Sequence, residues 1–330
     1  MQLSENTKYV IITHGGGDGV CAAAIAVSKL EDPIDIYFSQ PYTIIGLIRK
    51  LIRTEQKRRN DPNVDKLRIY IMDIHVNDAV VKLLKKFNKV VYIDHHSNSV
   101  KNKGEFPGKI DQYKSSSQLA AEYFSALKSP LATLGTVCDK LLSLPASDPM
   151  LKESILLQKS IACSIDDEEF RKHLVEQLAS GLLPSQISGV VKRSKCTDEE
   201  INRLLKHANK NILEVKNPKC AITYINDNIR GFGRQIARQL ISERNYPVFL
   251  LYPDISRNKI VIIARNNHDL KGREGSANID LAMFMKIYFS GGGHYNAAGG
   301  AIEGIDNPAV QMVKECFEEY NMEQYKVKGK

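Results

Sequence analysis

The sequence predicts an α/β protein, with a parallel-sheet domain and flanking helices joined by a linker to a smaller α/β C-terminal domain. Apolar, β-branched runs alternate with helical stretches over the first third of the chain. The middle is mainly helical, and strand patterns resume after it. Because 330 residues exceed one typical domain, we expect domains at 1–183 and 212–330 with a partly helical linker at 184–211.

The order of the elements explains the parallel sheet. In the first domain the expected strands are 9–13, 34–38, 67–72 and 90–93, and the expected helices are 19–30, 42–58 and 77–87. Strands that alternate with helices pair in parallel through right-handed crossovers. Helices should then fill 115–178. In the second domain we expect strands at 221–225, 248–252 and 259–264, and a helix at 232–243.

Composition bounds the class of protein. Hydrophobic residues make up 43% and charged residues 25%, as in a globular protein with a real core. No apolar run approaches the roughly 20 residues that span a bilayer. The first residues do not resemble a secretory signal, so we expect a cytoplasmic protein with no membrane partner. The six cysteines form no Cys-x-x-Cys pair, which argues against a zinc site or a disulfide framework.

The net charge of +8 favours an anionic partner, and nucleic acid is the first candidate. Two basic stretches stand out, Arg49, Lys50, Arg53, Lys57, Arg58 and Arg59 in an expected helix, and Lys326, Lys328 and Lys330 in the C-terminal tail. Either stretch is equally well explained as a solvated face or as a phosphate-contacting patch.

Metal-type ligands follow three of the expected strands. His14, Asp73 and Asp94 come directly after apolar runs, and Asp94 begins the triplet Asp94-His95-His96. Carboxyl ends of parallel strands meet at one edge of a sheet, which is where open α/β sheets bind ligands. Carboxylate with imidazole suits Mn²⁺. A surface loop explains any one of these by chance, but three at one edge are much harder to explain that way.

Two glycine-rich runs and one acidic run complete the pattern. The first run, from His14 to Gly19, is neither a dinucleotide fingerprint nor a Walker loop. The acids from Asp166 to Glu169 follow an apolar stretch, and a solvated helix start explains them as well. In the run from Ser290 to Gly300, three glycines precede His294 and an expected small-residue helix, which predicts an anion cradle of backbone N–H groups.

These motifs, in this order and spacing, resemble the DHH-family phosphoesterases with a DHH-associated C-terminal domain. That superfamily contains RecJ-type exonucleases, nanoRNA and cyclic-dinucleotide phosphodiesterases, and family II inorganic pyrophosphatases. The resemblance covers almost the whole chain. It implies metal ligands at His14, Asp18, Asp73, His95 and Asp166, a phosphate-contacting His96 supported by Asp94, and substrate binding by Arg265, Gly292, Gly293 and His294.

The resemblance also implies a function. We expect a Mn²⁺-dependent two-metal phosphodiesterase or exonuclease, with Mg²⁺ as an alternative metal, that activates water for attack on phosphorus. Its substrates would be single-stranded DNA or RNA, or short oligonucleotides, cut to mononucleotides in the cleft between the two domains. The basic charge and the glycine-rich C-terminal run disfavour a pyrophosphatase.

Gly16 departs from the family pattern, which is His-x-Asp-x-Asp-Gly where this chain has His-Gly-Gly-Gly-Asp-Gly. The first metal site then keeps His14 and Asp73, unless His75 or water substitutes for the missing acid. The alternative function is therefore a catalytically weakened, RecJ-like nucleic-acid-binding factor with replication or repair proteins as partners.

Overall fold

The computed structural model describes residues 9–31, 33–57, 67–227, 229, 231–266, 279–305 and 308–328. The chain divides into two compact units, Met1–Lys195 and Cys196–Lys330. The segment expected to link the domains contains a short 3-10 helix, Pro184–Gln186, and the long helix α8, Val190–Lys210. Of the basic residues singled out above, Arg58, Arg59 and Lys330 lie outside the described residues.

The N-terminal unit contains the predicted parallel sheet, which confirms the fold class. Its strands have the order β2-β1-β3-β4-β5 and every neighbouring pair is parallel. The strands are β1 (Tyr9–His14), β2 (Ile34–Ser39), β3 (Arg68–Met72), β4 (Val90–Asp94) and β5 (Gly108–Ile110). The sequence did not predict β5, which has three residues and too short a pattern to recognise.

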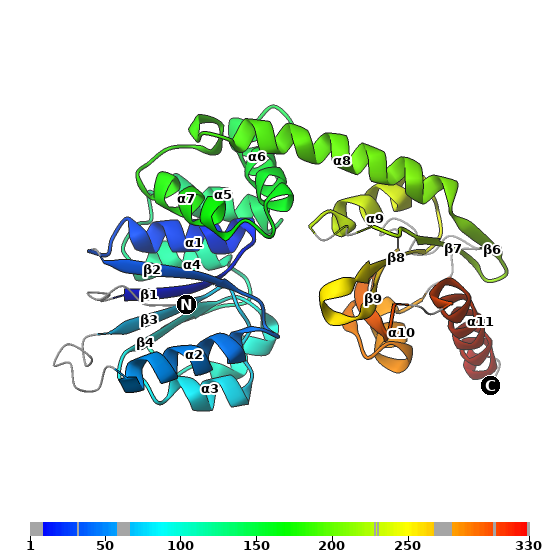
Figure 1. Cartoon of the computed structure of the whole chain (residues 1–330), viewed down its shortest axis with the longest axis horizontal. Helices are drawn as coiled ribbons and strands as arrows, with labels where there is room; N and C mark the ends of the chain where they lie inside the picture. Colours follow the sequence, from blue (N-terminus) through cyan, green and yellow to red (C-terminus); the bar gives the residue numbers. More distant parts are fainter. Residues whose placement is uncertain are drawn as a thin grey trace. The chain divides into compact units, whose positions relative to one another are not determined.

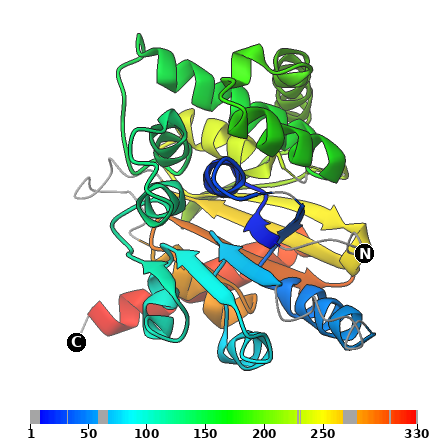
Figure 2. The same cartoon turned by 90° about the vertical axis from the view of Figure 1, so that its left-hand side faces the viewer.

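Two helical layers cover this sheet (Figure 1). On one face, α1 (Gly17–Val27), α4 (Ser116–Tyr123), α5 (Pro130–Cys138), α6 (Pro149–Cys163) and α7 (Glu168–Ala179) share a hydrophobic cluster with the strands. On the other face lie α2 (Ile44–Lys57) and α3 (Asp78–Leu84). Figure 2 shows α1 on one side of the sheet and α2 and α3 on the other. The alanines of α1 are completely buried, so small side chains let this helix approach the sheet and α4 closely.

The C-terminal unit is a mixed six-stranded sheet with the order β10-β11-β9-β8-β7-β6. Its strands are β6 (Leu213–Lys216), β7 (Lys219–Tyr224), β8 (Val248–Asp254), β9 (Lys259–Arg265), β10 (Gly292–His294) and β11 (Ala297–Glu303). One face packs against α8 and α9 (Gly233–Ser242). The opposite face packs against α10 (Leu281–Tyr288) and α11 (Ala309–Lys328).

The prediction of a small-residue helix after His294 is wrong, because that segment forms strand β11. β11 pairs antiparallel with both β9 and β10. Its small residues permit close packing instead of helix formation: a Cβ on Gly300 would lie 2.7 Å from Phe289 Cβ and 3.0 Å from the Met285 sulfur. The alanines and glycines of this run therefore serve a crowded strand rather than a helix.

Candidate metal centre

Three neighbouring strands carry the central ligands at their carboxyl ends. β1 ends at His14, β3 is followed by Asp73, and β4 ends at Asp94. β1, β3 and β4 lie side by side in the sheet, so the predicted convergence at one edge is observed. Asp73 adopts a left-handed conformation with φ of 56°, which Asp tolerates better than most residues. The Asp73 N–H donates to Ile93 O of the neighbouring strand β4 at 3.0 Å.

His95 lies between two carboxylates. Its Nε2 is 3.2 Å from Asp73 Oδ1, and its Nδ1 is 3.4 Å from Asp139 Oδ2. Ligand atoms of Asp73, His95 and His96 all lie within 4.8 Å of one another, and so do those of Asp18, His95 and Asp139. Oxygen and imidazole donors at this spacing fit a divalent transition metal.

Asp18 also has a structural role. Its Oδ2 accepts from the Ser116 N–H at 2.7 Å and its Oδ1 from the Ser117 N–H at 3.0 Å, at the start of α4. The positive end of the helix favours a charged carboxylate there. Ser116 Oγ donates in turn to Asp73 Oδ1 at 3.0 Å, which holds the two acids in one network. Each Asp18 oxygen accepts one of these N–H groups and has a second lone pair for a cation.

His14 faces the carboxylate oxygen of Asp73 that His95 does not contact. Its Nδ1 lies 3.7 Å from Asp73 Oδ2 and accepts from the Gly16 N–H at 3.2 Å. This makes Nε2 the protonated nitrogen, which donates to Gln40 Oε1 at 3.1 Å. Among the described residues, His14 belongs to no group of three or more convergent ligands.

Gly16 itself has ordinary extended backbone, with φ of −81° and ψ of 173°, so a side chain is conformationally allowed there. A Cβ at this position would lie 2.8 Å from His14 Nδ1. The missing acid would therefore begin beside the His14 imidazole, close to the Asp73 carboxylate.

Asp94 is a completely buried support for His96 rather than a member of either ligand group. Its Oδ1 lies 2.8 Å from His96 Nδ1. Its Oδ2 accepts from Tyr92 Oη at 3.0 Å and from the Ser99 hydroxyl. The His96 side chain is 44% exposed, so the ring is held at one nitrogen and reaches the surface. His75 contacts Ser99 Oγ at 3.1 Å and lies in neither ligand group.

The charges of this cluster are strongly coupled. Burial and the neighbouring Asp18 charge raise the pKa of Asp73. Burial alone would lower the pKa of His95, but the hydrogen bond to Asp73 and the charges of Asp73, Asp139 and Asp18 raise it to about 9. Carboxylates crowded in this way favour a bound cation, and without one they favour a proton on His95.

Asp166, predicted as the last acidic ligand, is not among these convergent residues. It is exposed in the turn between α6 and α7. Asp139, which the sequence reasoning missed, directly follows α5 and contacts His95 instead. The signal for it was a single acid after a short apolar helix, which is weaker than the run of four acids that drew attention to Asp166.

The predicted phosphate-binding residues all lie in the C-terminal unit. Arg265 ends β9 and pairs in register with Ala297, which in turn pairs with His294. Gly293 has φ of 147°, and a Cβ there would lie 2.5 Å from Ala297 O, so this position requires glycine. Gly292 is exposed, and a Cβ there would meet nothing within 4 Å. The hairpin therefore needs one of these two predicted glycines, Gly293, for its conformation.

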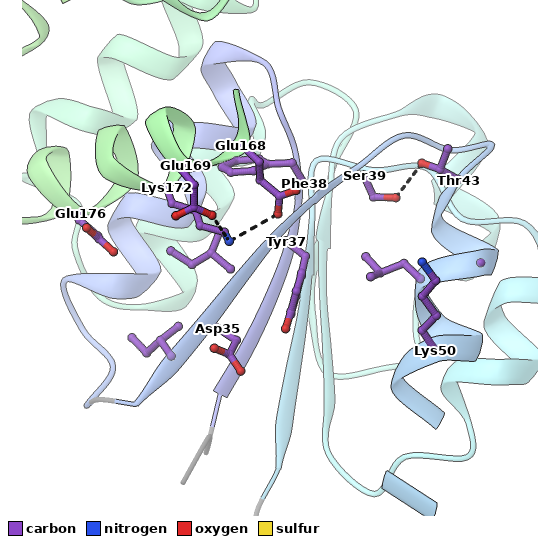
Figure 3. Close-up of a pocket in the computed structure, with 14 residues that line it drawn as sticks. Asp35, Tyr37, Phe38, Ser39, Thr43, Lys50, Glu168, Glu169, Lys172 and Glu176 are labelled. Atoms are coloured by element: carbon purple, nitrogen blue, oxygen red, sulfur yellow. Dashed lines mark hydrogen bonds and ion pairs between the residues drawn. The ribbon is translucent and has the colours of Figure 1, made fainter. Parts of the chain in front are cut away.

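A hollow of about 730 Å³ lies elsewhere in the N-terminal unit, along edge strand β2 and beside α2 and α7 (Figure 3). Lys50 projects into it from α2, and Lys172 on α7 pairs with Glu168 and Glu169. None of the clustered metal-type ligands lines this hollow. The hollow is therefore separate from the candidate metal centre.

Comparison with known proteins identifies the fold. No protein-family model and no curated protein matches the sequence. The DHH domain of a member of the S1p family of ribosomal proteins superposes with a TM-score of 0.64 at 16% identity, covering 96% of this chain and 87% of that one. This chain has the fold of RecJ-like DHH proteins.

Two further structures share this DHH fold. The pGpG-specific phosphodiesterase PggH from Vibrio cholerae has a TM-score of 0.57 at 14% identity, with 93% of this chain and 98% of that one covered. RecJ from Thermus thermophilus, solved with Mn²⁺, has a TM-score of 0.60 at 14% identity. The match covers 94% of this chain and 51% of RecJ. No helix among the described residues is long and apolar enough to cross a membrane.

Proposed function

We propose that this protein is a metal-dependent phosphodiesterase that hydrolyses single-stranded nucleic acid or short oligonucleotides. The observation that carries this is His95 lying between Asp73 and Asp139, with His96 grouped with Asp73 and His95. The DHH fold supports it, since two solved proteins with that fold are a dinucleotide phosphodiesterase and a Mn²⁺-bound RecJ. The net charge of +8 supports an anionic substrate.

Two overlapping groups, Asp73 with His95 and His96, and Asp18 with His95 and Asp139, would each offer ligands for a divalent cation beside His95, and Mn²⁺ suits their mix of oxygen and nitrogen donors. His14 and Asp73 would provide part of a second site. A bound cation supplies Lewis-acid charge and lowers the pKa of water to near neutrality. In this proposal Asp139 replaces Asp166 as the last acidic metal ligand, because Asp139 contacts His95.

His96 would contact the scissile phosphate. Asp94 fixes the His96 ring through Nδ1 and favours a proton on it, since the hydrogen bond and the charge of Asp94 raise the pKa of His96 although burial lowers it. A protonated imidazole at the surface can donate to a phosphoryl oxygen as negative charge develops there. Arg265, His294 and the backbone at Gly292 and Gly293 would bind phosphate in the C-terminal unit.

The alternative is a catalytically weakened, RecJ-like nucleic-acid-binding factor of replication or repair. Gly16 is the observation that favours it, because His14 is left outside both convergent ligand groups. In that case the protein would bind single strands and replication or repair proteins without cutting the strand.

The test uses 5′- and 3′-labelled single-stranded DNA and RNA and the dinucleotide pGpG, with Mn²⁺, with Mg²⁺ and with EDTA. Asp73→Asn is the inactive control, since it keeps a side chain that tolerates the left-handed backbone. Glu176→Gln, an exposed acid on α7, is the matched neutral control. Cleavage that requires metal and Asp73 supports the proposal. Binding of these strands without any cleavage would favour the alternative.

A further inference from the structure

Three arginines of the C-terminal unit gather on one face of its sheet. Arg234 and Arg238 lie one turn apart on α9, and Arg265 ends β9. α9 packs directly on this strand, since a Cβ on Gly233 would lie 2.6 Å from Ile263 Cδ1. Residues two apart on a strand share a face, so Arg265 is on the same side as Ile263, facing α9.

These arginines lack acidic partners within the described part of the chain. The hydrogen bonds and ion pairs of that part include none to Arg234, Arg238 or Arg265, and the Nε of Arg265 is buried without an acceptor. By contrast, Arg203 pairs with Glu200 and Asp227 in the same unit. Burial lowers the pKa of Arg265, and the charges of Arg238 and Arg234 lower it further. Such a group of like charges is stabilised when an anion binds.

We propose that Arg234, Arg238 and Arg265 form one binding site for two or more consecutive phosphate groups of a nucleotide chain. One guanidinium group can donate two parallel hydrogen bonds to two oxygens of the same phosphate, which makes arginine well suited to this ligand. Three positive charges exceed the single charge of one phosphodiester, so one phosphate alone would leave the site unbalanced. Cβ atoms one turn apart on a helix are about 5–6 Å from each other, which lets Arg234 and Arg238 contact different phosphates.

The register of the sheet connects this site to the glycine-rich hairpin. Arg265, Ala297 and His294 follow one another across β9, β11 and β10. Ala297 contributes only a methyl group between the two residues already expected to bind phosphate. This part of the inference rests on the proposed function, since the phosphates are those of its substrate. It extends that function by making α9 a determinant of substrate length.

Binding of fluorescein-labelled oligothymidylates in EDTA tests the site without any cleavage. Arg234→Gln and Arg238→Gln should each weaken binding of a trinucleotide about tenfold or more, which corresponds to about 1.4 kcal/mol. Each should also reduce the slope of log affinity against log salt by about 0.7, as expected for one lost phosphate contact on a single strand. Lys286→Gln is the matched control, because Lys286 is exposed on α10 at the opposite face of the same sheet.

Inorganic competitors define the ligand. Tripolyphosphate should displace the oligonucleotide from the wild-type protein at lower concentration than phosphate does, and this preference should shrink in both arginine variants. Arg234→Lys and Arg238→Lys keep the positive charge and serve as controls in case the glutamine variants misfold. They should bind the oligonucleotide with an affinity between those of the wild-type protein and the glutamine variants.

Two results would distinguish failure of the phosphate-site proposal from failure of the phosphodiesterase proposal. If the arginine variants bind and select competitors as Lys286→Gln does, the phosphate site is wrong, while cleavage by the wild-type protein can still hold. If arginine-dependent binding occurs but no metal restores cleavage, the site stands and the phosphodiesterase proposal fails.

Discussion

At the end of β4, His95 lies between Asp73 and Asp139, and Asp18 completes a group of three with His95 and Asp139. At the end of β1, His14 lies 3.7 Å from Asp73, accepts from the Gly16 N–H and contacts Gln40. Both regions use an imidazole beside the same carboxylate. They differ in their place among the convergent ligand groups of the described residues, since His95 belongs to two groups and His14 to none. We therefore expect the His95 side to bind a metal ion more firmly than the His14 side.

Asp73 is common to both regions, so its loss should have the largest effect. Asp73→Asn removes a charged ligand from each side and should lower the rate of oligonucleotide cleavage about 10³-fold, or about 4 kcal/mol of activation free energy. Steady-state cleavage of a labelled oligonucleotide measures this. A variant that keeps more than a tenth of the wild-type rate would contradict a shared metal ligand, provided that Glu176→Gln behaves as wild type.

Substitution of Asp139 and of Asp166 tests which of these two acids binds the metal ion beside His95. Asp139→Asn should weaken Mn²⁺ binding about 100-fold, because it removes a charged donor beside His95. Asp166→Asn should leave Mn²⁺ affinity unchanged, because Asp166 is exposed outside the ligand groups. Titration calorimetry with Mn²⁺ compares the two. If Asp166→Asn weakened Mn²⁺ binding and Asp139→Asn did not, Asp166 would be the metal ligand, as the sequence predicted.

Asp94 holds His96 beside the His95 ligand groups, and Tyr92 and Ser99 in turn hold Asp94. Tyr92→Phe removes the hydroxyl that donates to Asp94 Oδ2 and to Ile74 O, so the carboxylate is held less firmly. We expect kcat to fall about 10-fold, while KM and Mn²⁺ affinity change little. Tyr70→Phe, in the neighbouring strand β3, is the control for loss of a buried tyrosine hydroxyl. A fall in Mn²⁺ affinity without a fall in kcat would show that Asp94 acts on the metal rather than through His96.

Adding the missing acid should make the two regions more alike. Gly16→Asp places a carboxylate beside His14 Nδ1; the extended backbone allows a side chain, and the His14 ring must shift, because the new Cβ would lie 2.8 Å from Nδ1. We expect about 10-fold tighter binding of a second Mn²⁺ and a moderate increase in rate. Gly46→Asp, at an open position on α2, adds the same charge as a control. No change in either quantity would mean that Gly16 does not limit the weaker side.

The strand ends were predictable because buried strands have a clear apolar pattern and parallel strands place their carboxyl ends together. That reasoning located His14, Asp73 and the Asp94–His96 triplet at adjacent strands. Asp139 could not be found in this way, since its position beside His95 depends on how α5 packs against α1 and α4. Local sequence contains no signal for such packing.

The hairpin of β10 and β11 shows a second limit. The alanines at 297 and 298 favour a helix by propensity, yet the segment forms a strand whose Gly300 packs tightly against Phe289 and Met285. The network of Tyr92, Ser99 and Asp94 was also missed. Tyr92 and Asp94 lie in the same strand, but Ser99 lies beyond its end, and only the turn after β4 brings Ser99 back to them.

The difference between the two sides can be measured directly by the anomalous scattering of Mn²⁺ in crystals soaked with the ion. The account predicts a strong peak beside His95, within the group of Asp73, His95 and His96 or that of Asp18, His95 and Asp139, and a weaker peak or none between His14 and Asp73. A single peak at His14, or no peak beside His95 at saturating Mn²⁺, would contradict it.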